Sequence, residues 1–464
     1  MTRTLRLEGY RRSRHQLTVG FAFDDLFFSN SFWYADVDLR RLEERFGRDF
    51  LERIYFHVAA FEANKLCSLR PARLDLGPFA RFHTPAFEEV WRTVLRRVWA
   101  QWRYQHDDPD YAGPEIDSVA AGGGRPVAIA PGSTGALCFC GGGKDSLAAM
   151  KLLEDAAIAY DAFSYSSSVY GSAELQHRLA DRVLDHRRPG CRRRLWIFDD
   201  FMDSPVAGLH PELGTRHLLA GETPSSVFAA LPLVLAHGYR HLIVAHERSA
   251  DFGNLVWRRT GEEINHQWGK SLAAERLLTG YVEGELVSSV RYFSLLKPIW
   301  DVLIFNLLAG DLAAVRDAHS CNVEKPWCRR CPKCAYVWLG YAAFLPGDAA
   351  VSIFGRNLFD AAENLPHYRG MLGLEEHTPF ECIGTVGEAR LAFEICRRKG
   401  FGGRAMELFA DEVPAVDVAA SLDRYLAIDE GNSAIPAAIA RRLRGIFEGA
   451  AEEARQRLES LPAG

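Results

Sequence analysis

Short apolar runs alternate with amphipathic segments through the middle of the chain. The runs have the length and composition of buried strands, and the segments between them repeat apolar residues at helical spacing. This order of elements indicates an α/β fold with a doubly wound, mostly parallel sheet that helices cover on both faces. We predict strands at residues 136–140, 161–166, 195–198 and 241–245, and helices at residues 146–157, 173–185 and 224–236.

The regions on either side follow other patterns. Residues 15–23 alternate apolar and polar positions as a strand does, whereas residues 50–61 and 85–102 carry apolar stripes at helical spacing. Residues 107–135 are rich in proline and glycine and predict a linker. We therefore expect an N-terminal α+β domain at residues 1–130, an α/β domain at residues 131–345 and a helical C-terminal region at residues 346–464.

A glycine-rich turn joins the first predicted strand of the α/β domain to its first helix. Such a turn leaves backbone N–H groups free and aims a helix N-terminus at whatever lies above it, which suits an anion. A glycine turn that only connects strand and helix is the alternative. The candidate phosphate-binding residues are Gly141, Gly142, Gly143, Lys144, Asp145 and Ser146.

Two common phosphate-binding motifs do not fit this turn. The Walker A motif fails because Cys138 stands at its first glycine position and Asp145 follows Lys144. The dinucleotide-binding motif fails because Ser146 stands at its third glycine position. The turn instead resembles the PP-loop of the ATP pyrophosphatases, usually Ser-Gly-Gly-x-Asp-Ser, with Gly141 in place of the first serine. The resemblance implies a PP-loop core of the HUP type that holds the pyrophosphate of ATP.

Polar residues gather after the fourth predicted strand, at the edge of the sheet where α/β proteins bind ligands. Glu247 and Arg248 lie in the first group, and a surface loop is the alternative interpretation. His266 and Lys270 follow, four residues apart, and would share one face if this segment is helical. Either could act as a base or contact a phosphate. These four residues are our candidates for catalysis.

Four cysteines form the clearest metal-binding pattern. Cys321, Cys328, Cys331 and Cys334 have two short two-residue gaps, which suits a closed tetrahedral zinc site. Free thiols, an iron–sulfur site and a catalytic thiol pair are the alternatives. Cysteines of the first predicted strand are expected to be inert core residues. No useful spacing relates the remaining cysteines, which are Cys67, Cys191, Cys382 and Cys396.

Composition narrows the choice of partners. The 464 residues have a net charge of −5, which gives no overall electrostatic signal for nucleic acid. The arginine run at residues 192–194 is interpreted as a solvated loop. No apolar run approaches the ~20 residues of a membrane helix, and the first residues lack the apolar core of a signal peptide. We therefore expect a cytoplasmic protein with no membrane partner, in which cysteines are thiols or metal ligands.

Several stretches together resemble one enzyme family. They are residues 141–146, residues 247–271 with Ile-Asn-His-Gln-Trp-Gly-Lys-Ser at their end, residues 321–334 with Trp-Cys-x-x-Cys-Pro-Lys-Cys, and residues 379–385. In these the chain is similar to the ATP-dependent UDP-N-acetyl-α-D-muramoyl-L-alanyl-L-glutamate epimerases of peptidoglycan synthesis. The resemblance implies that ATP adenylates the α-carboxylate of the terminal L-Glu in UDP-MurNAc-L-Ala-L-Glu. Proton transfer and hydrolysis would then give D-Glu, AMP and pyrophosphate.

The resemblance suggests a role for each candidate residue. The turn at residues 141–146 would hold pyrophosphate, and Asp145 would help to hold Mg²⁺. Arg248 or Lys270 could neutralise the activated carboxylate. Glu247, His266 or a cysteine could move the proton.

Other functions are compatible with the PP-loop-like turn or with the four cysteines. A 7-cyano-7-deazaguanine synthase-like enzyme would also combine a PP-loop with a four-cysteine zinc site. A tRNA-thiolating enzyme would need a basic RNA-binding surface, against which the net charge of −5 counts. A zinc-stabilised nucleotide-sensing module would be no enzyme at all. The sequence leaves the oligomeric state open.

Overall fold

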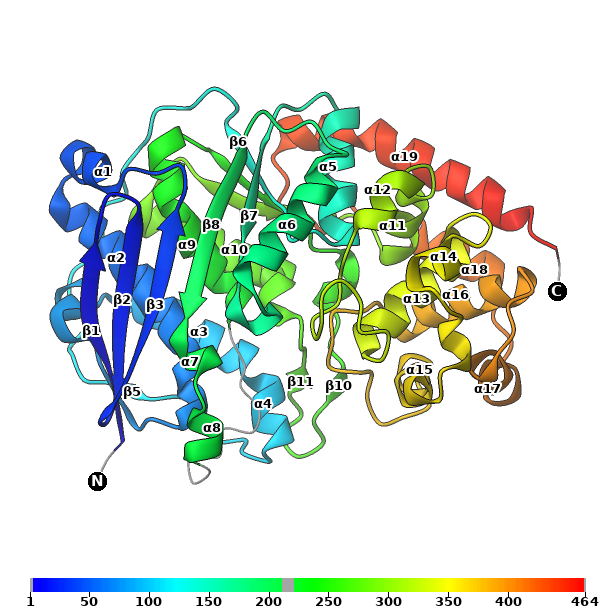
Figure 1. Cartoon of the computed structure of the whole chain (residues 1–464), viewed down its shortest axis with the longest axis horizontal. Helices are drawn as coiled ribbons and strands as arrows, with labels where there is room; N and C mark the ends of the chain where they lie inside the picture. The colour runs from blue at the N-terminus through cyan, green and yellow to red at the C-terminus, as the bar shows by residue number, and fades with distance from the viewer. Residues whose placement is uncertain (1–2, 211–220, 463–464) are drawn as a thin grey trace.

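One large sheet runs through the protein. The computed structural model describes residues 3–210 and 221–462, and within them ten strands pair in the order β12-β9-β6-β7-β8-β3-β2-β1-β4-β5. Figure 1 shows the N-terminal strands of this sheet at one end of the molecule and the C-terminal helices at the other. The ten strands are β1 (Thr4–Arg12), β2 (Gln16–Phe23), β3 (Leu26–Tyr34), β4 (Arg73–Asp75), β5 (Glu115–Ile116), β6 (Ala136–Phe139), β7 (Asp161–Tyr165), β8 (Arg192–Asp199), β9 (His241–Val244) and β12 (Arg291–Ser294). A separate small hairpin pairs β10 (Leu255–Val256) with β11 (Glu263–Ile264).

The five strands from β12 to β8 form one continuous parallel part of the sheet. Every neighbouring pair among them is parallel. Numbered along the chain, these strands stand in the spatial order 5-4-1-2-3, so the direction of winding reverses between β6 and β9. Ligands of doubly wound sheets bind beyond the carboxyl ends of the strands at such a reversal. The predicted mostly parallel α/β sheet is therefore confirmed.

The side chains of β6 alternate between the two faces of the sheet, and both faces are buried. Ala136 and Cys138 belong to one hydrophobic cluster, whereas Leu137 and Phe139 belong to another. Because successive strand residues point to opposite faces, the strand contributes to two cores. The first cluster holds residues of α5 (Lys144–Asp155), α6 (Ala173–Leu184), α11 (Asp301–Leu308), α12 (Leu312–Asp317) and α19 (Ala437–Glu459). The second holds residues of α1 (Leu39–Phe46), α2 (Arg48–Glu62), α3 (Pro85–Val98), α9 (Glu222–His237) and α10 (Leu272–Tyr281).

The predicted elements of the α/β domain agree well with the observed ones. Strands β6, β7 and β9 and helices α5, α6 and α9 begin and end within two residues of their predicted limits. Strand β12 was not predicted. The interpretation of residues 192–194 as a solvated loop is wrong, because these arginines open β8. Arg194 pairs with both carboxylate oxygens of Asp181 on α6, at 2.8 and 3.0 Å, which explains how so basic a strand is tolerated.

The N-terminal strands do not form a sheet of their own. Strand β3 pairs antiparallel with β8, so that β1 to β5 extend the parallel sheet. Residues on both sides of position 130 also share the second hydrophobic cluster. Pairing with β3 covers the backbone edge that β8 would otherwise present to solvent.

Helices make up the C-terminal part of the chain. From residue 346 onward the described residues contain helices and no strand, as predicted. Helix α13 lies against α11 and α16 and thereby joins this region to the α/β domain. The remaining helices of the protein are α4 (Ala100–Gln105), α7 (Asp200–Asp203), α8 (Val206–Leu209), α13 (Pro332–Phe344), α14 (Ala349–Phe354), α15 (Leu365–Met371), α16 (Val386–Arg398), α17 (Arg404–Glu412) and α18 (Val418–Tyr425).

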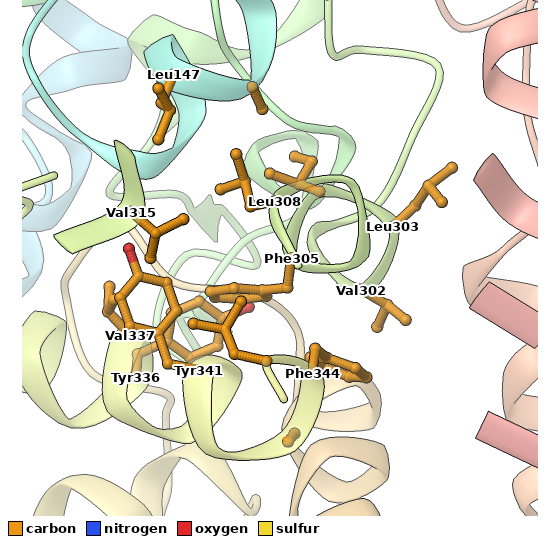
Figure 2. Packing of buried hydrophobic residues seen from close by; sticks show 14 of the residues in the cluster. Leu147, Val302, Leu303, Phe305, Leu308, Val315, Tyr336, Val337, Tyr341 and Phe344 are labelled. Carbon is orange, nitrogen blue, oxygen red and sulfur yellow. The ribbon is translucent and has the colours of Figure 1, made fainter. Parts of the chain in front are cut away.

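Close packing holds α5, α11 and α13 together. Figure 2 shows Leu147 of α5 facing α11, and Phe305 of α11 facing Tyr336 and Tyr341 of α13. A β-carbon added at Gly340 on α13 would overlap the ring of Phe305. This glycine therefore allows the two helices to approach each other closely.

We expect Gly340→Ala to lower the free energy of unfolding by ~1–3 kcal/mol, because the added methyl group must displace Phe305. Gly445→Ala is the matched control, since Gly445 lies exposed in α19 with nothing near its β-carbon position. That variant should gain about 0.5–1 kcal/mol through helix propensity. Urea unfolding of both variants measures the difference, and equal stability of the two would contradict the packing argument.

Candidate functional site

A cavity of about 350 Å³ lies at the carboxyl ends of β6, β7 and β9. It is bounded by the glycine turn before α5, the N-terminal end of α9, the segment that contains His266, and parts of the four-cysteine segment. The cavity thus occupies the reversal point of the doubly wound sheet, where ligands of this architecture bind. Its polar lining includes Asp145, Ser146, Glu222, His246, His266, Lys270, Asn322, Lys325, Lys333 and Cys382.

The glycine turn presents backbone rather than side chains to this cavity. Gly142 has φ +78°, and a β-carbon there would overlap the imidazole of His319. Gly143 precedes α5 in an extended conformation and offers no side chain to cap the helix. The first N–H groups of α5 are therefore not capped by this residue, as an anion-binding helix N-terminus requires. Of the six candidate phosphate-binding residues, Gly141, Gly143, Asp145 and Ser146 line the cavity.

Lys144, which was predicted to contact phosphate, does not belong to the cavity lining. Its side chain is fully buried, and its ammonium group forms ion pairs with Asp145 and Asp301. Burial disfavours the charged form, but the two carboxylates outweigh this effect and raise the pKa of Lys144. The Tyr336 hydroxyl donates to Asp301 at 2.8 Å. Lys144 thus anchors the turn to the helices below it.

A carboxylate on α16 extends this buried network. Glu388 accepts the backbone N–H of Asp301 at 2.9 Å and the hydroxyl of Ser249 at 2.7 Å. It also accepts the backbone N–H of Thr385 at 2.8 Å in a capping box at the start of α16. Burial, together with the nearby Asp301, raises the pKa of Glu388 to about 7. The network links α5, α11, α13 and α16 beneath the cavity.

Glu247 and Arg248, two of the candidate catalytic residues, do not belong to the cavity lining. Glu247 is buried, and although burial alone would raise its pKa, the ammonium groups of Lys144 and Lys270 lower it to about 2. So weakly basic a carboxylate is better suited to a fixed counter-charge than to a general base. Arg248 lies outside the cavity lining, where it pairs with Asp429 at 2.8 Å and covers the ring of Trp300.

His266 and Lys270 both reach the cavity, although not from one continuous helix. A short 3₁₀ turn at Trp268–Lys270 carries the lysine, and His266 precedes it. His266 Nδ1 lies 2.6 Å from Gln101 Oε1, and Lys270 Nζ lies 2.9 Å from Cys382 Sγ. Cys382, which also lines the cavity, was not among the candidate site residues predicted from the sequence. Its spacing to other cysteines carries no signal, but residues 379–385 had already been noted for their family resemblance.

The four cysteines form a compact cluster. All four sulfur atoms lie within 4.8 Å of one another. The Sγ atoms of Cys321 and Cys331 are 3.7 Å apart, and those of Cys328 and Cys334 are 3.8 Å apart. Four sulfurs at ~2.3 Å from a tetrahedral zinc ion would be ~3.8 Å from one another, so the separations fit that ion.

The cysteine segment also shapes the cavity. Backbone N–H groups of Val323 and Glu324 point at the sulfur of Cys321, at 3.4 and 3.3 Å. The same segment carries Lys325 and Lys333 into the cavity lining. The cluster therefore fixes the position of two cations that face the ligand space.

His246 and Glu275 form a pair at the cavity wall. His246 lies two residues after the end of β9 and lines the cavity, and its Nδ1 atom is 3.8 Å from Glu275 Oε1. Glu275 is fully buried on α10, where burial raises its pKa to about 8. Burial disfavours the charged form of His246 as well, and this lowers the pKa of its imidazole. A neutral imidazole therefore faces the cavity with an acid behind it.

Comparison with known proteins identifies the family. Residues 212–295 match the MurL N-terminal domain, and residues 315–416 match the MurL C-terminal domain. The UDP-N-acetyl-alpha-D-muramoyl-L-alanyl-L-glutamate epimerase of Xanthomonas oryzae pv. oryzae is 32% identical over 329 residues, which cover 67% of this chain and 68% of that protein. The chain belongs to this epimerase family. The family resemblance seen in the sequence is thus confirmed, and the chain is an enzyme of the isomerase class.

Two further members of the epimerase family match shorter stretches. The epimerase of the same name from Micromonospora sp. is 32% identical over 267 residues, 56% of this chain and 56% of its own length. That from Salinispora tropica is 34% identical over 194 residues, 40% of this chain and 42% of its own length. No solved structure matches the chain. In the part of the chain that the structure describes, no helix combines the length and apolarity needed to cross a bilayer.

We expect the buried acid behind His246 to make stability depend on pH. Because the pKa of Glu275 rises from 4.5 to about 8 on folding, its contribution is lost as the pH rises between these values. Glu275→Gln cannot ionise, so it should gain stability over the parent protein by roughly 2–4 kcal/mol at pH 9 and by little at pH 5.

Urea unfolding at the two pH values measures this difference. Glu44→Gln, at an exposed position on α1, is the matched control and should show no such trend. A constant difference between Glu275→Gln and the parent protein would show that Glu275 does not titrate in this range.

Proposed function

We propose that this chain epimerises the terminal glutamate of UDP-MurNAc-L-Ala-L-Glu, and that ATP drives the reaction by adenylating the α-carboxylate. Family membership supports the substrate, because the related proteins carry that substrate in their names. The observation that carries the mechanism is the cavity itself. It combines a helix N-terminus, whose N-cap glycine offers no side chain, with three lysines and two cysteines.

Activation of the carboxylate answers a chemical difficulty. Removing the α-proton of a carboxylate anion would place a second negative charge next to the first. An acyl adenylate carries no charge at that carbonyl, so the enolate that forms has a single charge to stabilise. Reprotonation on the opposite face and hydrolysis of the adenylate then yield D-Glu and AMP.

On this proposal, one group of cavity residues would bind the phosphates and Mg²⁺, and a second group would bind the carboxylate of the substrate. The turn at residues 141–146 would bind the pyrophosphate through its backbone N–H groups, as in the PP-loop enzymes that it resembles. Asp145 would supply a carboxylate ligand to Mg²⁺, which neutralises phosphate charge when bound. Lys270, Lys325 and Lys333 would face the carboxylate of the substrate and the charge that develops on it.

The size of the cavity limits what it can enclose. A volume of about 350 Å³ lies at the low end for sites that hold one small molecule, and ATP with a UDP-linked sugar peptide is much larger. We therefore propose that the phosphates of ATP and the terminal glutamate meet inside the cavity. The nucleotide and sugar portions of the second substrate would lie outside it.

Incubation with ATP, Mg²⁺ and UDP-MurNAc-L-Ala-L-Glu in D₂O tests the function. We expect AMP, pyrophosphate and D-Glu as products, and deuterium at the glutamate α-position only when ATP is present. The measurements are nucleotide chromatography, chiral analysis after hydrolysis and mass spectrometry. Deuterium incorporation without ATP would contradict the adenylation mechanism, and absence of D-Glu would contradict the substrate.

Asp145→Asn should reduce AMP formation by at least ~100-fold, because the change removes the charge that faces the phosphates and Mg²⁺. The side chain keeps its size, so circular dichroism should show a folded protein. Asp155→Asn, near the other end of α5 in a surface ion pair with Lys151, is the matched control and should keep its activity. Equal rates for the two folded variants would remove Asp145 from the site.

We further propose that Cys321, Cys328, Cys331 and Cys334 hold a structural zinc ion. Support comes from the separations between their sulfur atoms and from the backbone N–H groups that point at these sulfurs. A zinc ion would add folding energy to a segment that contains little regular structure before α13. It would thereby hold Lys325 and Lys333 in place.

Metal analysis should find about one zinc per chain, and Cys328→Ser should lower both the zinc content and the melting temperature, by at least roughly 5 °C. Cys191→Ser, which removes an exposed cysteine outside the cluster, is the matched control and should change neither. Metal-free protein with an unchanged melting temperature would instead indicate free thiols, and bound iron would indicate an iron–sulfur site.

A further inference from the structure

Cys382 lies where a proton-transfer group would be needed. It lines the cavity together with Lys270, whose ammonium group is 2.9 Å from its sulfur. His266 Nδ1 or Nε2, a carboxylate oxygen of Glu381 and Cys382 Sγ all lie within 4.8 Å of one another. Lys333 donates to the backbone carbonyl of Cys382 and fixes the main chain at this point.

We infer that Cys382 is the catalytic residue that carries the α-proton of glutamate on one face of the substrate, with Lys270 holding its sulfur as a thiolate. The inference rests on the function proposed above and assigns one step of it. Cys382 is a better candidate than Glu247, because it lines the cavity and Glu247 does not.

A comparison of two cysteines in the same cavity supports this assignment. Burial raises the pKa of Cys140 to about 11, so this residue stays a neutral thiol. Burial acts in the same direction on Cys382, but Lys270 and His266 outweigh it and lower the pKa of its thiol. The thiolate is the reactive form of cysteine, and a pKa near the working pH suits a general base. The charged and titratable groups that face this sulfur are Lys270, Lys333, His266, Glu381 and Tyr170.

A metal site at this position is disfavoured by the same geometry. His266, Glu381 and Cys382 offer ligand types that zinc accepts. However, the ammonium group of Lys270 already occupies the sulfur at hydrogen-bond distance and would repel a divalent ion. Glu381 is engaged as well, since it accepts the amide N–H of Asn322 at 2.7 Å and the backbone N–H of Cys382 at 2.8 Å.

The step balances in protons and electrons. The thiolate sulfur takes the α-proton of the acyl adenylate, and the electron pair of the broken C–H bond passes into the carbonyl group. The enolate oxygen that results is stabilised by the lysines that line the cavity. A proton from a group in exchange with solvent then forms the new C–H bond on the opposite face, and the thiol of Cys382 returns its proton to solvent.

The test separates adenylation from proton transfer. Cys382→Ala and Cys382→Ser are incubated in D₂O with ATP, Mg²⁺ and either UDP-MurNAc-L-Ala-L-Glu or its D-Glu epimer. Pyrophosphate release and α-deuterium are measured in the same reactions. We expect pyrophosphate release to stay within ~5-fold of the parent protein, while α-deuterium incorporation falls by at least ~100-fold from one or both epimers. Cys191→Ser is the matched control and should retain both signals.

Two outcomes overturn the inference while leaving the proposed function intact. Deuterium incorporation at the parental rate from both epimers would show that Cys382 does not move the proton. Equal loss of pyrophosphate release and deuterium incorporation would show that Cys382 serves binding or folding. If the parent protein itself gives neither signal, the proposed function fails instead.

Alkylation by iodoacetamide tests the thiolate without any substrate. Its rate is followed from pH 5.5 to 9.5, and peptide mass spectrometry separates Cys382 from exposed Cys191. We expect the midpoint of the pH profile of Cys382 to lie below that of Cys191, and Lys270→Met to shift it upward. Coincident midpoints, or no shift in Lys270→Met, would overturn the thiolate assignment whatever the activity assay shows.

Discussion

The buried ammonium group of Lys144 is the interaction on which the arrangement of the site depends. It ties the first residue of α5 to Asp301, the first residue of α11, and Asp301 in turn accepts the hydroxyl of Tyr336 on α13. Removing one partner of such a pair leaves an uncompensated charge in the core, which costs several kcal/mol. A lysine that left this position for a phosphate would incur that cost. The glycine turn is therefore rigidly connected to the C-terminal helices.

Cations reach the cavity from short segments that other interactions hold in place. Lys270 stands on a 3₁₀ turn, and Lys325 and Lys333 lie within the segment that carries the four clustered cysteines. Glu247, buried and negatively charged, offsets part of this positive charge from behind. Cations that are fixed before a ligand arrives need little reorganisation as charge develops, which is how preorganised sites stabilise transition states. The cavity is therefore lined by cations whose positions are already fixed.

The sequence predicts the centre of the fold better than its margins. A short apolar run locates β6, apolar residues at helical spacing locate α5 and α9, and the glycine turn between β6 and α5 marks the ligand edge of the sheet. The pairing of β3 with β8 joins residues more than 150 positions apart, and no local pattern reports it. The same limit applies to the site. Lys144 and Cys382 take their roles from Asp301 and Lys270, which are distant in sequence.

The position of Cys382 in the chain determines when the cavity can be completed during synthesis. The turn at residues 141–146 leaves the ribosome long before residue 382, yet both line one cavity. Until α11 and α13 emerge, the apolar side of α5 lacks the residues of these two helices that cover it in the folded protein. The N-terminal strands and the second hydrophobic cluster, by contrast, draw mostly on earlier residues. All strands of the large sheet therefore precede Cys382 in the chain, and the lining of the cavity is complete only after this residue has been synthesised.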